Sequence, residues 1–288
     1  MTSNSTPSSK DVQLSEARRR RASLLLIVVA VLFVLVPFLF WRGTWFGRAL
    51  NDEELGQYLA DEAQPRHIQH ALVQIGERIN RGDRAAGRWY PQVVALAESP
   101  HPEIRITLAW VLGADTRAEE FHQALRPLLL DTEPMVRRNA ALSLVRFGDA
   151  GGREEILSML RPFAVLAPAE GMLSYQLPVG NPVERGTLLA RIETGQGTLD
   201  IQSPLAGTVE RRLAEDQTNV KAGEEILVLA PGTEQVWEAL RALYLVGRAE
   251  DLPEVERYVR GEVPDMAEEV QRQATLTAAE IRRRVSKQ

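Results

Sequence analysis

Side chains that could perform acid–base or metal chemistry occur in small groups along this sequence of 288 residues. Adjacent glutamates occur at four places: Glu119-Glu120, Glu154-Glu155, Glu224-Glu225 and Glu268-Glu269. Because adjacent residues on a helix do not face each other, no such pair could hold a substrate between its carboxyl groups. His67 and His70 are three residues apart and could share a metal ion. A zinc site needs a third ligand, and His101 and His122 fall in other segments. We therefore expect no catalytic residues and no metal site.

The amino-acid composition excludes further kinds of chemistry and of binding partner. The sequence contains no cysteine, which excludes disulfide bonds and thiolate chemistry. Its net charge of -5 gives no reason to expect nucleic acid as a partner. The sequence also has neither a phosphate-binding glycine-rich loop nor the Gly-x-Ser-x-Gly motif of hydrolases.

The most specific motif is the run that begins at Ile192: Ile-Glu-Thr-Gly-Gln-Gly-Thr-Leu-Asp-Ile-Gln-Ser-Pro-Leu-Ala-Gly-Thr-Val. It resembles the hairpin of lipoyl and biotinyl carrier domains, in which a modified lysine lies at the turn. Here the turn is Gly195-Gln196-Gly197, and Gln196 occupies the position of that lysine. An amide nitrogen is not a usable nucleophile, so the resemblance implies the fold without a cofactor. We expect Gly195, Gln196 and Gly197 to close a tight turn or to contact a partner. Lys221 lies in a different turn, and we do not expect it to be an attachment site.

The motif belongs to a segment that contains an internal duplication. Pro168-Ala-Glu-Gly171 matches Pro204-Leu-Ala-Gly207, and Val183-Glu-Arg-Gly186 matches Val220-Lys-Ala-Gly223. Each half contains alternating apolar residues typical of strands, and its glycines suit turns. Two such halves resemble the barrel-sandwich hybrid fold of lipoyl, biotinyl and membrane-fusion (periplasmic adaptor) proteins. We assign this all-β, lipoyl/biotinyl-like domain to residues 163–231.

The segments on either side are predicted to be helical repeats. The stretch from Pro102 matches the stretch from Pro134 at a distance of 32 residues, and Pro65 begins a weaker copy. Each copy opens with proline, which costs nothing at the first helical position, and continues with apolar residues at helical spacing. Two helices per repeat indicate an α-solenoid that resembles HEAT-like repeats of the phycobilin-lyase type. The repeats occupy residues 50–162.

The same pattern resumes in residues 232–288. We expect one helix from Glu234 to Gly247, another from Leu252, and a terminal cap that begins at Pro264. Arg153–Arg161 has the character of a first helix whose partner is delayed until Glu234, so the β domain is predicted to interrupt a single repeat. The expected fold is therefore mainly α, with an inserted all-β domain. Trp110, between Ala109 and Val111, is expected to belong to the core or to line a partner-binding groove.

The N-terminal region has the pattern of a membrane anchor. Residues 1–21 form a disordered basic segment that ends in Arg18, Arg19, Arg20 and Arg21. Residues 22–41 form an uncharged run of 20 residues, long enough to cross a bilayer. Trp41 and Trp45 would lie in the far membrane interface. A cleaved signal peptide is the alternative, but its apolar stretch is shorter and ends at small residues, which this run does not do. The arginines place the N-terminus in the cytoplasm and, in a bacterium, the later domains in the periplasm, with the anchor in the inner membrane.

Three kinds of function remain open. The first is a non-catalytic, single-pass scaffold or accessory subunit of a larger membrane protein complex, such as a respiratory or transport complex. The second is a component of an efflux or secretion system that resembles a periplasmic adaptor. Those adaptors split their barrel around a long helical hairpin, for which Thr194 to Thr198 leaves no room. The third is an enzyme, since HEAT-like repeats also occur in phycobilin lyases. The lack of a modifiable lysine and of a catalytic constellation argues against it.

Overall fold

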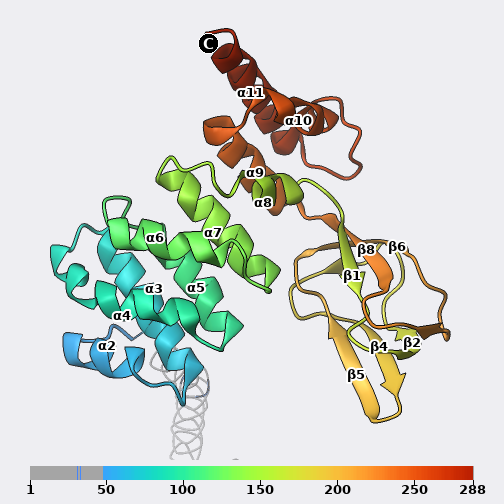
Figure 1. Cartoon of the computed structure of the whole chain (residues 1–288), viewed down its shortest axis with the longest axis horizontal. Helices are drawn as coiled ribbons and strands as arrows, with labels where there is room; N and C mark the ends of the chain where they lie inside the picture. Colours follow the sequence, from blue (N-terminus) through green and yellow to red (C-terminus); the bar gives the residue numbers. More distant parts are fainter. Residues whose placement is uncertain (1–30, 32, 34–47, 288) are drawn as a thin grey trace, which may run out of the picture. The chain divides into compact units, whose positions relative to one another are not determined.

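The computed structural model describes residues 31, 33 and 48–287 (Figure 1). The expected transmembrane segment and its flanking residues Arg18–Arg21, Trp41 and Trp45 lie outside this range, apart from positions 31 and 33. No helix in the described part of the chain is both long and apolar enough to span a bilayer.

The chain divides into two units, residues 1–55 and 56–288. Helix α2 (Asp52–Leu59), which contains the boundary between the two units, begins with a reciprocal cap. The backbone N–H of Asn51 donates to Glu54 Oε2, and that of Glu54 donates to Asn51 Oδ1, both at 2.9 Å. These bonds satisfy amide groups that have no partner within the first helical turn.

The second unit contains helices before and after a β region. The helices are α3 (Pro65–Asn80), α4 (Tyr90–Ala95), α5 (Pro102–Leu112), α6 (Glu119–Leu128), α7 (Pro134–Arg146), α8 (Arg153–Ser158), α9 (Thr233–Val246), α10 (Leu252–Val259) and α11 (Glu268–Val285). Short 3₁₀ turns lie at Arg84–Trp89, Leu96–Glu98 and Ala249–Asp251. Proline occupies the start of α3, α5 and α7, as the sequence predicts. The prediction that Pro264 opens the last helix is wrong. Asp265 has a φ of 57°, a left-handed conformation that a right-handed helix cannot include, and α11 begins at Glu268.

Five of the described helices pack side by side in one row: α3 contacts α5, α5 contacts α7, α7 contacts α9, and α9 contacts α11. Buried hydroxyl groups form hydrogen bonds between neighbouring helices of this row. Ser143 Oγ donates to the carbonyl of Ala109 at 2.7 Å, and Thr277 Oγ1 donates to that of Leu240 at 2.8 Å. The helices approach closely at Gly113, where an added Cβ would lie 2.5 Å from Ser143 Oγ. Stacked helix pairs of this kind are the architecture of an α-solenoid.

Helices α8 and α9 pack together although the whole β region separates them in sequence. They share one apolar core, which includes Ile156 and Leu157 from α8 and Leu240 and Leu243 from α9. Tyr258 Oη also donates to the carbonyl of Leu160 at 2.6 Å. The chain therefore leaves the helical array after α8 and returns to the same place at α9.

Eight strands are described between these two helices: β1 (Phe163–Leu166), β2 (Gly171–Tyr175), β3 (Pro182–Val183), β4 (Leu188–Thr194), β5 (Gly197–Gln202), β6 (Gly207–Arg212), β7 (Asn219–Val220) and β8 (Glu225–Pro231). They form two antiparallel four-stranded sheets, in the orders β1-β8-β6-β3 and β5-β4-β2-β7. Apolar side chains from both sheets, among them Leu173, Ile192, Val209 and Leu229, form one core. The described fold is thus a mixed one of many helices and two antiparallel sheets.

The sequence duplication relates the two sheets to each other. An offset of 36 or 37 residues converts β1, β2, β3 and β4 into β5, β6, β7 and β8, and it converts the strand order of one sheet into that of the other. The hydrogen bonds follow the same rule. Gly186 N–H donates to the carbonyl of Ser203 at 2.7 Å, and Gly223 N–H donates to that of Ala167 at 2.8 Å. Each sheet is therefore built from strands of both halves.

The duplication also explains an unusual backbone conformation. Gln217 has a φ of 60°, which residues with a side chain rarely adopt. Its equivalent in the first half is Gly180, with a φ of 89°. Gly180 N–H bonds to the carbonyl of Val209, and Gln217 N–H bonds to that of Leu173, the residue equivalent to Val209. The β-sheet pairing imposes the same turn on both halves.

Candidate functional site

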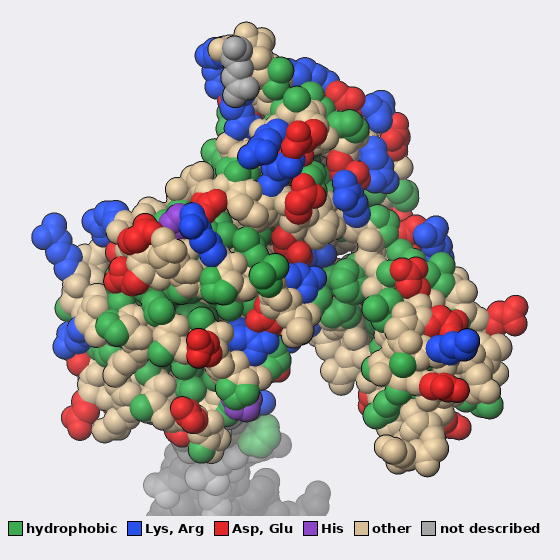
Figure 2. Space-filling model, in the orientation of Figure 1, with side chains coloured by type: hydrophobic (Ala, Val, Ile, Leu, Met, Phe, Trp, Pro, Cys, Tyr) green, Lys and Arg blue, Asp and Glu red, His purple; other side chains and the backbone are tan. Residues whose placement is uncertain are grey.

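The first candidate is the hairpin between β4 and β5 (Figure 1). Thr194 pairs with Gly197, so the turn consists of Gly195 and Gln196, both exposed. Thr194 Oγ1 accepts a hydrogen bond from Gln196 N–H at 3.1 Å and donates to the carbonyl of Gly197 at 2.8 Å. Gly197 has a φ of 134°, where a side chain would be strained, and this accounts for one of the two glycines. The tip in Figure 2 is uncharged, as its residue types require.

The chemistry available at this tip is limited to an exposed amide. The Gln196 side chain makes no hydrogen bond within the described residues, so it is accessible, but it has no amine to acylate. Lys221 lies after β7, in the turn that the duplication relates to Glu184. Its backbone N–H donates to Glu224 Oε2 at 2.9 Å. The structure therefore places Lys221 and Gln196 in separate turns.

The histidines that could have formed a metal site have other partners. His67 Nδ1 lies 2.7 Å from Asp61 Oδ2, and its ring stacks on Tyr58. His70 is buried, with Nε2 2.8 Å from Gln74 Nε2. In the described part of the chain, no three acidic or histidine side chains are arranged to hold a metal ion.

Two of the four glutamate pairs lie on helices before the β region, Glu119-Glu120 on α6 and Glu154-Glu155 on α8. Glu155 faces Arg137, with Oε2 3.0 Å from Nε, whereas its neighbour Glu154 faces Arg153. The two carboxylates of this pair thus serve different salt bridges. Glu119 and Glu120 are both exposed at the start of α6.

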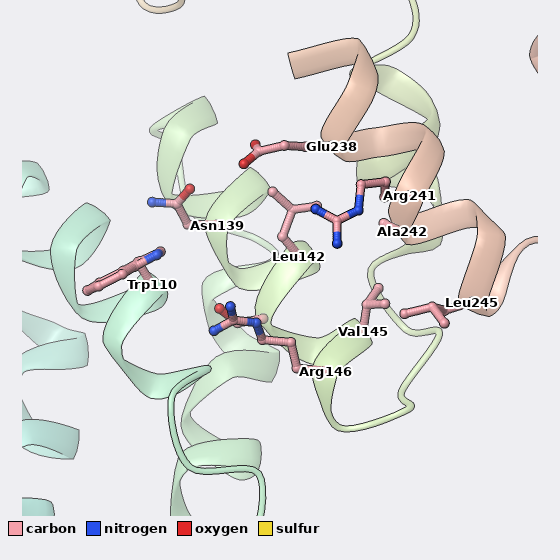
Figure 3. A pocket seen from close by; sticks show the side chains of 10 residues that line it. Trp110, Asn139, Leu142, Val145, Arg146, Glu238, Arg241, Ala242 and Leu245 are labelled. Atoms are coloured by element: carbon pink, nitrogen blue, oxygen red, sulfur yellow. The ribbon is translucent and has the colours of Figure 1, made fainter. Parts of the chain in front are cut away.

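The second candidate is a groove of about 260 Å³ that crosses α5, α7 and α9 (Figure 3). Trp110 of α5 lies on one side and Leu245 of α9 on the other, with Leu142 and Val145 of α7 between them. Trp110 is 45% exposed and Leu245 is 59% exposed, so a large apolar side chain is open to solvent on each side of the groove. We call this surface, formed by Trp110, Leu142, Val145, Arg146, Arg241 and Leu245, the α5–α7–α9 groove.

The position of Trp110 depends on a glycine in the preceding helix of the row. An added Cβ at Gly76 of α3 would lie 3.4 Å from Trp110 Cζ3. One edge of the indole therefore lies against the backbone of α3, while the remainder faces solvent. This packing holds an amphipathic side chain in place at the surface, as is typical of interface residues.

Two arginines and one glutamate provide the charge of the groove. Arg146 donates to the carbonyl of Gly113 at 3.2 Å, and the Arg241 guanidinium lies 4.5 Å from the ring centre of Trp237. Neither forms a salt bridge with any residue that the structure describes, although both guanidinium charges act on the carboxylate of Glu238 from a longer distance. Burial raises the pKa of Glu238, which also lines the groove, and the nearby charge of Glu234 raises it further.

The sequence predicts Trp110 to be a core or groove-lining residue, and Trp110 does line this groove. Leu142, Arg146, Arg241 and Leu245 are not among the predicted site residues. An exposed leucine late in a predicted helix was the available signal at Leu245. The groove itself was not foreseeable, because α7 and α9 are separated by the β region, and their neighbourhood depends on how the chain returns to the helical row.

Comparisons with known proteins support the helical part of this description. Residues 90–165 match a family model described as HEAT repeats, so the repeats of this segment, α4 to α8, are HEAT-like. A search of curated proteins gave no match. Among solved structures, the chain is similar to a single-chain, multi-domain long-chain acyl-CoA carboxylase, with 21% sequence identity and a TM-score of 0.24. The match covers 36% of this chain but only 10% of the carboxylase chain, and at this TM-score it carries no conclusion about function.

Proposed function

We propose that this protein is a non-catalytic, membrane-anchored scaffold, an accessory subunit of a larger membrane protein complex such as a respiratory or transport complex. Its helical repeats and its β region bind partner subunits. The observation that carries the proposal is the α5–α7–α9 groove, in which an indole and a leucine remain exposed beside two arginines that form no salt bridge within the described residues. Surfaces of this composition suit protein–protein interfaces, where aromatic side chains and arginine are enriched.

The β region supports a structural rather than a carrier role. The two halves of the duplication are related by an operation that carries each four-stranded sheet onto the other, as a lipoyl/biotinyl-like barrel-sandwich hybrid would require. In the proposal, residues 163–231 form such a domain, and its exposed Gly195-Gln196-Gly197 turn is a contact point. A carrier domain moves on a flexible linker, whereas β1 and β8, the first and last strands here, pair with each other and lead directly into α8 and α9. The short turn also argues against an adaptor that is split by a long helical hairpin.

The membrane anchor in residues 22–41 is part of the same proposal and rests on the sequence pattern alone. It predicts that a reporter fused after Gln288 is active outside the cytoplasm. A fusion that is active only in the cytoplasm would overturn this orientation.

The main test is purification of the tagged full-length chain from its native membrane in a mild detergent. We expect partner subunits in fixed stoichiometry that resist a salt wash, with an unrelated tagged single-pass protein as control. Recovery of the chain as a lone monomer, or with the same proteins as the control, would overturn the scaffold function.

A further inference from the structure

The α5–α7–α9 groove has features that define the chemistry of its partner. We propose that it binds a segment of a partner protein in which a large apolar side chain is flanked by aspartate or glutamate. This inference rests on the scaffold function proposed above and names the site and the kind of segment it recognises.

The apolar part of the groove fits one side chain better than a small-molecule ligand. Its volume of about 260 Å³ is below the range of about 300–1,000 Å³ that is typical of ligand pockets. Trp110 and Leu245 form its two walls, and Leu142 and Val145 form the floor between them. A leucine, methionine or phenylalanine from a partner would bury exposed apolar surface of both walls at once.

The charges select an acidic partner. Arg146 and Arg241 come from different helices and flank the apolar floor (Figure 3). Other arginines of the helical array are paired with carboxylates within the chain; Arg137 faces Glu155 and Arg153 faces Asp251, for example. Arg146 and Arg241 form no salt bridge within the described residues, and the single carboxylate of Glu238 does not balance their two charges. Both can therefore bind a carboxylate of a partner, a ligand that the planar guanidinium suits.

A nucleic acid or a polyphosphate fits less well. Glu238 lines the same groove and Glu234 lies one turn before it, so the positive charge is confined to the two guanidinium groups. Binding to a phosphate backbone needs a broad positive surface. On the face shown in Figure 2, acidic and basic side chains are instead interspersed over the C-terminal helices. Within these helices, Glu256 forms ion pairs with both Arg260 and Arg282.

The test is site-specific photo-crosslinking in the native membrane with the full chain. Leu245→p-benzoylphenylalanine places the crosslinker on the rim of the groove, and Leu130→p-benzoylphenylalanine, at a position 87% exposed outside it, is the control. We expect the Leu245 variant to crosslink to a partner segment that carries an apolar residue beside Asp or Glu. The charge reversals Arg146→Glu and Arg241→Glu together should lower the yield roughly tenfold. Arg211→Glu, at an exposed position of β6 without a salt bridge in the described chain, should leave the yield unchanged.

The outcomes separate this inference from the proposed function. Crosslinks to lipid, to nucleic acid, to a second copy of the chain or to a basic segment would overturn the inference. So would a yield that survives charge reversal, or no adduct at position 245 while the wild-type complex is purified intact. Failure to recover any complex would overturn the scaffold function itself, and the inference with it.

Discussion

The guanidinium of Arg105 and the carboxylate of Asp131 form a two-point contact between successive helical repeats. Arg105 Nε lies 2.6 Å from Asp131 Oδ2, and Nη2 lies 2.9 Å from Oδ1. The third nitrogen, Nη1, donates to the carbonyl of Ser99 at 2.7 Å. Asp131 Oδ1 also accepts the backbone N–H of Glu133 at 2.8 Å, so this carboxylate fixes the turn before α7. One ion pair thus joins α5 to the start of the next helix in its row.

Removing the cation should therefore destabilise the array. In Arg105→Ala, the Asp131 carboxylate is still largely shielded from solvent, but it no longer has the guanidinium that donates to both of its oxygens. We expect the free energy of unfolding to fall by about 2–3 kcal/mol, the cost of leaving a largely buried charge unpaired. Urea denaturation followed by circular dichroism measures it. The matched control is Arg211→Ala, an exposed arginine without a salt bridge in the described chain, which should change stability by less than about 0.5 kcal/mol. Equal stability of the two variants would contradict the prediction.

The same pair predicts a dependence of stability on pH. The hydrogen bonds from Arg105 hold the pKa of Asp131 below its usual value. A lowered carboxylate pKa stabilises the fold at pH values above the unfolded pKa of about 4 and ceases to do so as the pH falls through the folded pKa. The advantage of wild type over Asp131→Asn should hence be constant from pH 7 to pH 5 and shrink below pH 4. Urea midpoints of both proteins at these pH values provide the measurement. A difference that does not vary with pH would show that the charge is not responsible.

The arginine contacts also show why much of the helical fold was predictable. Arg105 and Arg137 are 32 residues apart, and Arg137 Nη1 donates to the carbonyl of Asp131 at 2.8 Å, the position equivalent to Ser99. Because each repeat uses an arginine for the same local contact, the arginine recurs at the repeat distance and can be recognised in a single sequence. The carboxylate partner differs between the two arginines: Arg105 pairs with Asp131 in the turn before the next helix of the row, whereas Arg137 pairs with Glu155 of α8. After α8 the chain enters the β region, so no equivalent of Asp131 follows.

The groove had no such periodic signal. Trp110 and Arg241 come from helices on opposite sides of the β region, and nothing in the residues of either helix indicates the other. The start of α11 was mispredicted for a related reason. Proline at 264 fits a helix start by type, whereas the left-handed Asp265 beside it is a property of the folded loop.

The duplicated glycines of the β region should be essential for its packing. An added Cβ at Gly207 would lie 2.4 Å from the carbonyl oxygen of Ala230, and one at Gly171 would lie 2.3 Å from that of Glu193. Backbone atoms of a paired strand cannot move aside easily, so Gly171→Ala and Gly207→Ala should each cost about 1–3 kcal/mol. Gly195→Ala is the control, because nothing lies within 4 Å of its added Cβ. Protease susceptibility of residues 163–231 would report the loss. Equal resistance of all three variants would contradict this account of the close approach.

The last prediction concerns covalent modification. The lysines of the sequence are Lys10, Lys221 and Lys287, and the exposed hairpin tip carries Gln196 instead. Because attachment of lipoate or biotin requires an amine at that tip, the intact mass of the chain purified from its native membrane should contain no lipoyl or biotinyl group. Lys221→Arg is the informative comparison, since Lys221 lies in the turn that the duplication relates to Glu184 and not in the hairpin. Wild type and Lys221→Arg should both lack the added mass. A lipoyl or biotinyl adduct on wild type that disappears in Lys221→Arg would make the β region a carrier with a displaced attachment site. The structural role proposed for the β region would then be wrong.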